Sequence, residues 1–229
     1  MFLESKDLTQ TRQWLSESER EAILVIVQAS FSKIEPNDYL AKYFEGGQVF
    51  ERKLRLYFSE QQLVGYCLLT FTEEQDTTVI RASAGFLPDY RKGGNTFRFS
   101  LLESLKFWLR RPWRKLYYAD TMLSPAMYRA IAKKTGIVWP HPLNEASCEL
   151  FEWLNPNGKI SPQNDLRCLV PVERVSNYSQ RELESFQASD KPEIQYYCRV
   201  NSDFDRGCAL FVIIPVNLKQ LALTLIKNL

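Results

Sequence analysis

The chain has 229 residues, of which 45% are hydrophobic and 24% are charged, and its formal net charge is +2. This composition is typical of a globular protein that can bury a substantial core, and so small a net charge favours neither a nucleic-acid partner nor an anionic membrane. Because no apolar run approaches the roughly 20 residues that span a bilayer and the first residues lack a signal-peptide pattern, we expect a cytoplasmic protein with no nucleic-acid and no membrane partner.

Two helices are predicted before the first strands. Two overlapping pairs, Ser16 with Glu19 and Ser18 with Glu21, have the spacing of a capping box. The apolar positions behind them predict a helix of about 15 residues. Pro36 is typical of the first position of a helix, and Gly46-Gly47 is typical of the end of one. The order therefore begins with a long helix followed by a short one.

Three strands and a long helix are predicted next. The runs 53–59 and 62–71 are rich in apolar and aromatic residues and are joined by a short polar bridge, which predicts a hairpin. The run 78–87 predicts a third strand, which Pro88 ends. Apolar residues spaced by three and four then predict a helix to about Arg110.

After that helix, the run 116–123 predicts a strand. Ser124 followed by Pro125 predicts the N-cap and first turn of a further helix, which Gly136 ends. A strand, a crossover helix and a second strand imply parallel pairing, so we expect 78–87 and 116–123 to pair in parallel.

The C-terminal third is predicted to hold more strands than helices. The runs 147–154, 194–200 and 209–214 are interpreted as strands, 181–186 as a short helix and 217–229 as a terminal helix with an apolar face. We expect one domain over residues 1–229, with a core at about 16–154 and a C-terminal elaboration at 155–229 that completes the sheet.

The most informative stretch connects the strand at 78–87 to the helix behind it. It holds Arg91, Lys92 and the pair Gly93-Gly94 just before the helical spacing begins. The first N–H groups of a helix lack partners and lie at its positive end, and glycines let a phosphate approach the backbone. The stretch is a candidate diphosphate cradle. The alternative is a helix start whose glycines only close a connection. The stretch lacks the sequence motifs of the P-loop and of the dinucleotide-binding fingerprint.

The stretch Arg91-x-x-Gly94-x-Thr96 resembles the acetyl-CoA loop of the GNAT acetyltransferase superfamily, with Thr96 where that family has a small residue. The order of predicted elements over about residues 16–140 is also similar to the family's core. The resemblance implies an α/β (α+β) fold with a mixed central sheet, flanked by helices, in which the strand at 78–87 and its neighbour splay apart.

The resemblance further implies a cofactor, acetyl-CoA or another acyl-CoA, with its diphosphate on the N–H groups of 92 to 96. In the family, the backbone just before the loop pairs with the amides of pantetheine. The cofactor-binding residues expected on this basis are Phe86, Leu87, Arg91, Lys92, Gly93, Gly94, Asn95, Thr96 and Ser124.

Acyl transfer to an amine needs a base for the ammonium and a proton donor for the leaving thiolate. Many relatives place a tyrosine four residues before the glycine that ends the second helix, and Ala132 stands there in this chain. Tyr128, one turn earlier on the same face, is the candidate acid, and its alternative is a core or surface aromatic. Asp120 is the candidate base, and its alternative is a carboxylate that caps a neighbouring backbone group. His141, between two prolines, is better interpreted as part of a fixed loop.

The five cysteines are an odd number and widely spaced, without a C-x-x-C pair. We interpret them as reduced, mostly buried thiols. With one histidine in the chain, no metal site is predicted.

Two classes of function follow. The first is an acyl-CoA-dependent N-acyltransferase that acts on an amine of a small molecule or a protein. The second is a GNAT-like domain without turnover that binds acyl-CoA or a partner, which the missing tyrosine favours. A nucleic-acid binder using the cations at 110–115 is a third reading and predicts affinity that falls steeply with salt. The sequence leaves a homodimer open.

Overall fold

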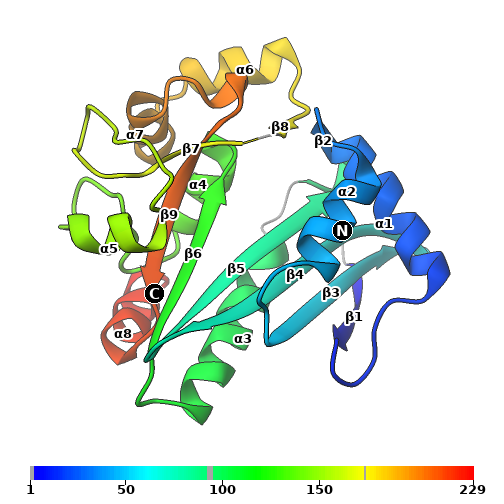
Figure 1. Cartoon of the computed structure of the whole chain (residues 1–229). Coiled ribbons are helices and arrows are strands. Elements are labelled where there is room, and N and C mark those ends of the chain that lie inside the picture. The colour runs from blue at the N-terminus through cyan, green and yellow to red at the C-terminus, as the bar shows by residue number, and fades with distance from the viewer. Residues whose placement is uncertain (1–2, 92–94, 173) are drawn as a thin grey trace. The chain divides into compact units, whose positions relative to one another are not determined.

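The computed structural model describes residues 3–91, 95–172 and 174–229 (Figure 1). The chain divides into two compact units, Met1–Lys115 and Leu116–Leu229. Both units combine antiparallel strands with helices, so the predicted α/β (α+β) class is confirmed. The parallel pairing and splaying of 78–87 and 116–123 would join the two units, and these stay predictions, as does the single domain over 1–229.

The first unit contains an antiparallel sheet in the order β1-β3-β4-β5. Its strands are β1 (Glu4–Thr9), β3 (Glu51–Ser59), β4 (Gln62–Glu74) and β5 (Thr77–Phe86). The predicted hairpin is confirmed, with Glu60 and Gln61 both at positive φ in its two-residue turn. Strand β1 was missed because it is polar and mostly exposed at the edge of the sheet.

The helices of the first unit begin where the local signals predict. They are α1 (Glu17–Ser30), α2 (Pro36–Leu40), the π-helical turn η1 (Ala41–Glu45), the 3₁₀ turn η2 (Pro88–Tyr90) and α3 (Asn95–Arg110), with the two-residue strand β2 (Phe31–Ser32) after α1. The Ser16–Glu19 capping box is present, which confirms that prediction. Pro36 occupies the first turn of α2, and Gly46 follows the end of η1.

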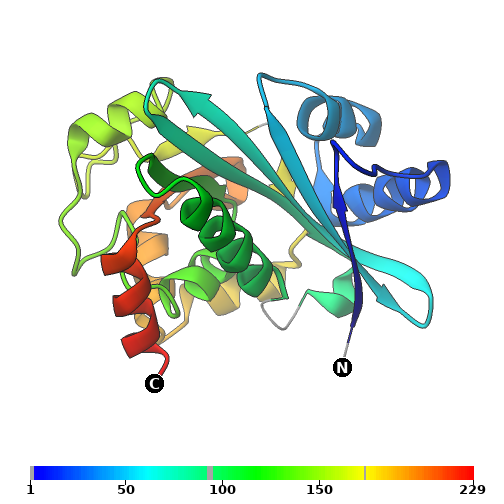
Figure 2. The ribbon, with the colours of Figure 1, turned by 90° about the horizontal axis from the view of Figure 1, so that it is seen from below.

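Helices cover both faces of the first unit's sheet (Figure 2). The hydroxyl of Tyr66 on β4 donates to Tyr39 of α2, whereas the thiol of the next residue, Cys67, lies 3.9 Å from the hydroxyl of Ser100 on α3. Because successive strand residues point to opposite faces, α2 and α3 lie on opposite sides of β4. The core of this unit is therefore two apolar layers with the sheet between them.

The second unit contains an antiparallel sheet in the order β6-β9-β7. The strands of this sheet are β6 (Lys115–Met122), β7 (Leu169–Pro171) and β9 (Cys208–Pro215), and the short strand β8 (Val175–Ser176) lies outside it. The helices of this unit are α4 (Pro125–Ala132), α5 (Cys148–Leu154), α6 (Gln180–Gln187), α7 (Pro192–Val200), the 3₁₀ turn η3 (Phe204–Arg206) and α8 (Leu218–Lys227). The predictions of β6, α4, α6, β9 and α8 are confirmed.

Two predicted strands of the C-terminal third are wrong. The run 147–154 forms α5, whose N-cap hydroxyl on Ser147 accepts the N–H of Leu150. The run 194–200 forms α7, which begins at Pro192. Both runs are short and apolar, a pattern that does not separate a strand from one face of a helix. The burial of Ile194, Tyr197 and Val200 has the spacing of a helix, three residues apart.

The cysteines are less buried than predicted. Cys67 and Cys168 are buried, Cys148 is exposed, and the other two lie between these limits, all five as free thiols. Among the described residues, none of the helices has the length and apolar character that crossing a bilayer requires.

Candidate functional site

The chain passes from strand β5 through a 3₁₀ turn to helix α3, which is the predicted order of strand, turn and helix. Strand β5 ends at Phe86, a 3₁₀ turn follows over Pro88–Tyr90, and α3 begins at Asn95. Lys92, Gly93 and Gly94 lie outside the described residues, as does the side chain of Asn95. The prediction that amides of 92 to 96 converge on an anion therefore stays a prediction.

The backbone N–H and C=O groups of successive residues at the end of β5 point to opposite edges of the strand. The N–H of Leu87 donates to the carbonyl of Val64 on β4 at 2.9 Å. In an antiparallel pair the backbone groups of the preceding residue point the other way, so those of Phe86 face the edge of β5 that β4 does not cover. The Phe86 carbonyl accepts from the Ser30 hydroxyl at 3.1 Å and from Arg91 Nε at 3.4 Å. A cofactor amide at this carbonyl would have to displace one of these donors.

Arg91 connects the loop to the end of α1. Its Nη2 donates to the carbonyl of Ala29 at 2.9 Å, in the last turn of α1, where the helix dipole favours a cation. The guanidinium thus bridges two carbonyls that are far apart in sequence, those of Ala29 and Phe86. These contacts tie Arg91 to the ends of α1 and β5, and a contact of Arg91 with phosphate stays a prediction.

The start of α3 has the character of an anion site. Asn95 and Thr96 are the first residues of a 16-residue helix, and the N–H groups of a first turn have no partner within their helix. The aligned peptide dipoles make this end partly positive. Thr96 is partly exposed. Binding of a diphosphate at this helix start, which the resemblance implies, stays a prediction.

A buried ion pair anchors the middle of α3 to β3. Nζ of Lys53 lies 2.6 Å from one carboxylate oxygen of Glu103, and Nζ of Lys106 lies 2.6 Å from the other. Lys53 and Glu103 are both buried. Burial alone raises the pKa of Glu103, but the hydrogen bonds from Lys106 and Lys53 outweigh it and hold that pKa below its usual value. The Glu103 carboxylate therefore stays ionised at neutral pH, and its contact with Lys53 holds the helix on the sheet.

In the second unit, the two predicted polar residues near the end of β6 have backbone partners. Oδ1 of Asp120 accepts the N–H of Thr121 at 2.8 Å. Ser124 is fully buried, and its Oγ accepts the N–H of Met127 at 3.3 Å, which confirms it as the N-cap of α4. The Tyr178 hydroxyl lies 3.0 Å from the same Oγ. The base role of Asp120 and the cofactor role of Ser124 stay predictions.

Tyr128 is part of the core of the second unit. It is fully buried, and its hydroxyl donates to the carbonyl of Pro140 at 2.9 Å. Its ring packs against those of Tyr196 and Tyr197. Burial, with smaller contributions from Tyr196 and Glu193, raises its pKa. Before this hydroxyl could protonate a thiolate it would have to leave Pro140, so the geometry favours the core-aromatic interpretation.

His141 is held as part of a fixed loop, as the sequence indicates. Its Nδ1 accepts the N–H of Leu143 at 3.2 Å, which leaves the proton of the neutral ring on Nε2. Burial, and then the nearby charge of Lys227, lower its pKa. A neutral imidazole whose acceptor nitrogen already has a donor is a poor general base.

No protein-family profile and no curated protein matches the chain. Among solved structures, it is similar to the ribosomal-protein-S18-alanine N-acetyltransferase from Escherichia coli, with 11% identity, TM-score 0.37, and coverage of 93% of this chain and 96% of that one. An acetyltransferase from Bacillus subtilis in complex with CoA has 8% identity, TM-score 0.38, and coverage of 94% and 99%. The PaiA N-acetyltransferase from Thermoplasma acidophilum, in complex with coenzyme A, has 12% identity, TM-score 0.34, and coverage of 72% and 96%.

All three are acetyltransferases. Their identities and TM-scores are low, so we argue the function of this chain from its own residues.

Sequence reasoning missed a chain of buried hydroxyls in the first unit. The Tyr66 hydroxyl donates to Tyr39 at 2.8 Å, and the Tyr39 hydroxyl is hydrogen-bonded to Ser83 on β5. Tyr39 and Tyr66 are fully buried. A Cβ on Gly85 would come within 2.9 Å of the Tyr66 ring, so this packing needs a glycine. Glycine inside a predicted strand was the available signal, since it often marks such a close approach.

Proposed function

We propose that the chain is an acyl-CoA-dependent N-acyltransferase, with acetyl-CoA as the expected donor and an amine of a small molecule or a protein as acceptor. One observation carries the proposal. Strand β5 ends at Phe86 and the 16-residue helix α3 begins at Asn95, so the sequence Arg91-x-x-Gly94-x-Thr96 ends in the first turn of a helix. A helix N-terminus offers an anion unpaired N–H groups and the positive end of the helix dipole, so the motif stands where a phosphate can bind.

The cofactor is proposed to bind along two backbone features of the first unit. The N–H groups at the start of α3, together with those of the preceding loop, would hold the diphosphate. The edge of β5 at Phe86 that β4 does not cover would pair with pantetheine, after release of one donor from the Phe86 carbonyl. Arg91, fixed by Ala29, would keep the loop in place. Bound acetyl-CoA supplies an activated thioester.

Asp120 is proposed as the base that takes a proton from the acceptor's ammonium, directly or through water. It is partly exposed on β6, and an ionised carboxylate can accept hydrogen bonds at both of its oxygens. Tyr128 is the proposed acid for the thiolate and would act by exchanging its hydrogen bond to Pro140 for one to sulfur.

A second candidate function is a GNAT-like module that binds acyl-CoA or a partner without turnover. A specific observation favours it. The Tyr128 hydroxyl is buried against the Pro140 carbonyl, and Ala132 stands where relatives have the acid. In this case the loop before α3 binds the cofactor, but no side chain protonates the leaving group.

Two measurements on the full chain separate these candidates. Isothermal titration calorimetry with acetyl-CoA tests binding, and release of free thiol over a panel of small amines and peptide N-termini tests turnover. Binding with release supports the enzyme, and binding without release over the panel supports the module. The matched variant is Gly94→Asp, which puts a carboxylate where the diphosphate is expected and should abolish binding. Absence of binding by the wild type, or equal affinity of both forms, would refute the cradle.

A further inference from the structure

Helix α8 docks on the second unit through polar side chains. Gln220 accepts the N–H of Ile137 at 2.6 Å and donates to the Ile137 carbonyl at 2.9 Å. Thr224 accepts the N–H of Gly136 at 3.0 Å, and Nζ of Lys227 donates to the carbonyls at the end of α4, including that of Ala132 at 2.8 Å. Gln220 and Thr224 are the buried residues of this helix. The buried side of a helix usually carries apolar residues, but the buried side of α8 is held by hydrogen bonds to the chain at Gly136 and Ile137.

The opposite side of α8 is apolar and exposed. Leu218 is 66%, Leu225 60% and Ile226 67% exposed, and Leu229 is fully exposed. At about 100° per residue, Leu218, Ala222, Leu225 and Ile226 fall within an arc of about 100° that faces away from Gln220 and Thr224. We call these four residues the apolar face of α8. Exposed leucines that gather on one face of a helix mark an interaction surface.

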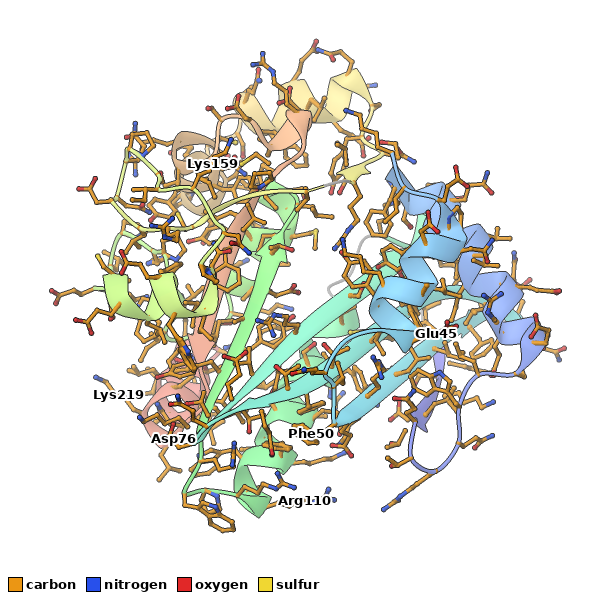
Figure 3. The ribbon with its side chains drawn as sticks, viewed as in Figure 1. Glu45, Phe50, Asp76, Arg110, Lys159 and Lys219 are labelled. Atoms are coloured by element: carbon orange, nitrogen blue, oxygen red, sulfur yellow. The ribbon has the colours of Figure 1, made fainter. Side chains whose placement is uncertain are left out.

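The two stretches that hold α4 and α8 carry an excess of positive charge. The stretches 125–144 and 216–229, which hold α4 and α8, contain no Asp or Glu. They contribute the cations Arg129, Lys133, Lys134, Lys219 and Lys227. Arg129 is paired with Glu193 at 3.6 Å, and Nζ of Lys227 donates to carbonyls at the end of α4, whereas Lys219 projects outward from α8 (Figure 3). The net charge of +2 for the chain therefore hides a local excess of positive charge beside exposed leucines.

We propose that the apolar face of α8 lies on an anionic lipid surface, with its leucines among the lipid chains and Lys219 on its flank at the head groups. A helix with an apolar face and lysines on its flanks binds the bilayer interface in this way. Ten residues make about 15 Å of helix, too short to span a bilayer, so the helix lies in the plane of the interface.

A second copy of the chain fits this face less well than lipid does. A helix of about 15 Å offers a few hundred Å², below the roughly 800 Å² per partner of a stable interface. Pairing the apolar faces of two α8 helices would also bring together two positively charged flanks, each with Lys219, and like charges across an interface are unfavourable. A lipid surface needs no fixed contact area, and anionic head groups attract Lys219.

Vesicle co-sedimentation of the full chain tests the proposal. We expect the wild type to sediment with vesicles of phosphatidylcholine and phosphatidylserine at least tenfold more strongly than with phosphatidylcholine alone, and binding should weaken as salt rises. Leu225→Ser with Ile226→Ser should lower the affinity at least tenfold and leave the thermal unfolding midpoint unchanged, because both side chains are exposed. The matched control is Leu143→Ser, since Leu143 is 86% exposed on a loop of the same unit and this variant should bind like the wild type.

Three results would overturn the proposal. One is failure of the wild type to sediment with the phosphatidylserine vesicles, and a second is equal binding by the double variant and the wild type. The third is a dimer in sedimentation velocity that the double variant abolishes, which would make a second copy the occupant of the face. None of these readouts depends on CoA binding, so the lipid proposal and the proposed function can fail separately.

Discussion

Arg91 offers a sharp test of how the loop before α3 is held. Its guanidinium donates to the Ala29 carbonyl at 2.9 Å and to the Phe86 carbonyl at 3.4 Å. A hydrogen bond from a charged donor contributes about 1.5–3 kcal/mol. The second contact is long and the side chain is partly exposed, so we expect Arg91→Ala to lower the free energy of unfolding by about 1–2 kcal/mol.

The assay is urea unfolding followed by tryptophan fluorescence, with calorimetric titration of acetyl-CoA on the same preparations. An unchanged m-value with a lower midpoint would assign the change to stability. Arg98→Ala is the matched control, because Arg98 is an exposed cation on α3 just beyond the loop, and its stability should change by less than about 0.5 kcal/mol.

The two variants together separate a structural role of Arg91 from a phosphate contact. If the Ala29 contact is its main role, Arg91→Ala loses stability and its CoA affinity falls no more than that of Arg98→Ala. Unchanged stability of Arg91→Ala together with a large, selective loss of affinity would refute the reasoning, because the guanidinium would then serve the ligand and not the two carbonyls.

Three further predictions follow from buried polar contacts. Glu103→Gln removes the carboxylate that pairs with buried Lys53 and should lower the free energy of unfolding by about 3 kcal/mol at pH 7. Because the folded-state pKa of Glu103 is lowered, the stability that its charge contributes is complete above the unfolded pKa of about 4.3 and is lost as the pH falls through the folded pKa. The urea midpoints of variant and wild type should therefore converge in acid, and a constant gap between them would contradict this. Tyr128→Phe removes the bond to Pro140 and should cost about 1 kcal/mol and lower thiol release at unchanged CoA affinity; equal release would leave Tyr128 a core residue only. Gln220→Leu removes both bonds to Ile137 and should cost about 2 kcal/mol, seen as faster hydrogen exchange in α8; unchanged exchange would mean that other contacts dock the helix.

Local signals in the sequence predicted the elements that frame the site. The capping box at Ser16 and the two-residue turn at Glu60-Gln61 act within a few residues, and the structure has both. The same holds for the N-cap at Ser124. Short-range rules therefore placed β5, α3 and β6 to within about two residues of their ends.

Elements decided by tertiary contacts were predicted less well. Helices α5 and α7 have seven and nine residues, too few for the apolar pattern to distinguish a helix from a strand. The role of Arg91 depends on a carbonyl 62 residues away, and the bond of Tyr128 depends on the path of the chain at Pro140. Residue type and spacing indicate which chemistry is available at such positions, but not which partner uses it.

The account depends most on the backbone of residues 92 to 96, and a crystal structure with bound CoA tests it most directly. We predict that the diphosphate lies within hydrogen-bond distance of several N–H groups of this stretch, at the start of α3. CoA bound with its diphosphate elsewhere, or those N–H groups bonded to the protein's own carbonyls beside the ligand, would contradict the account.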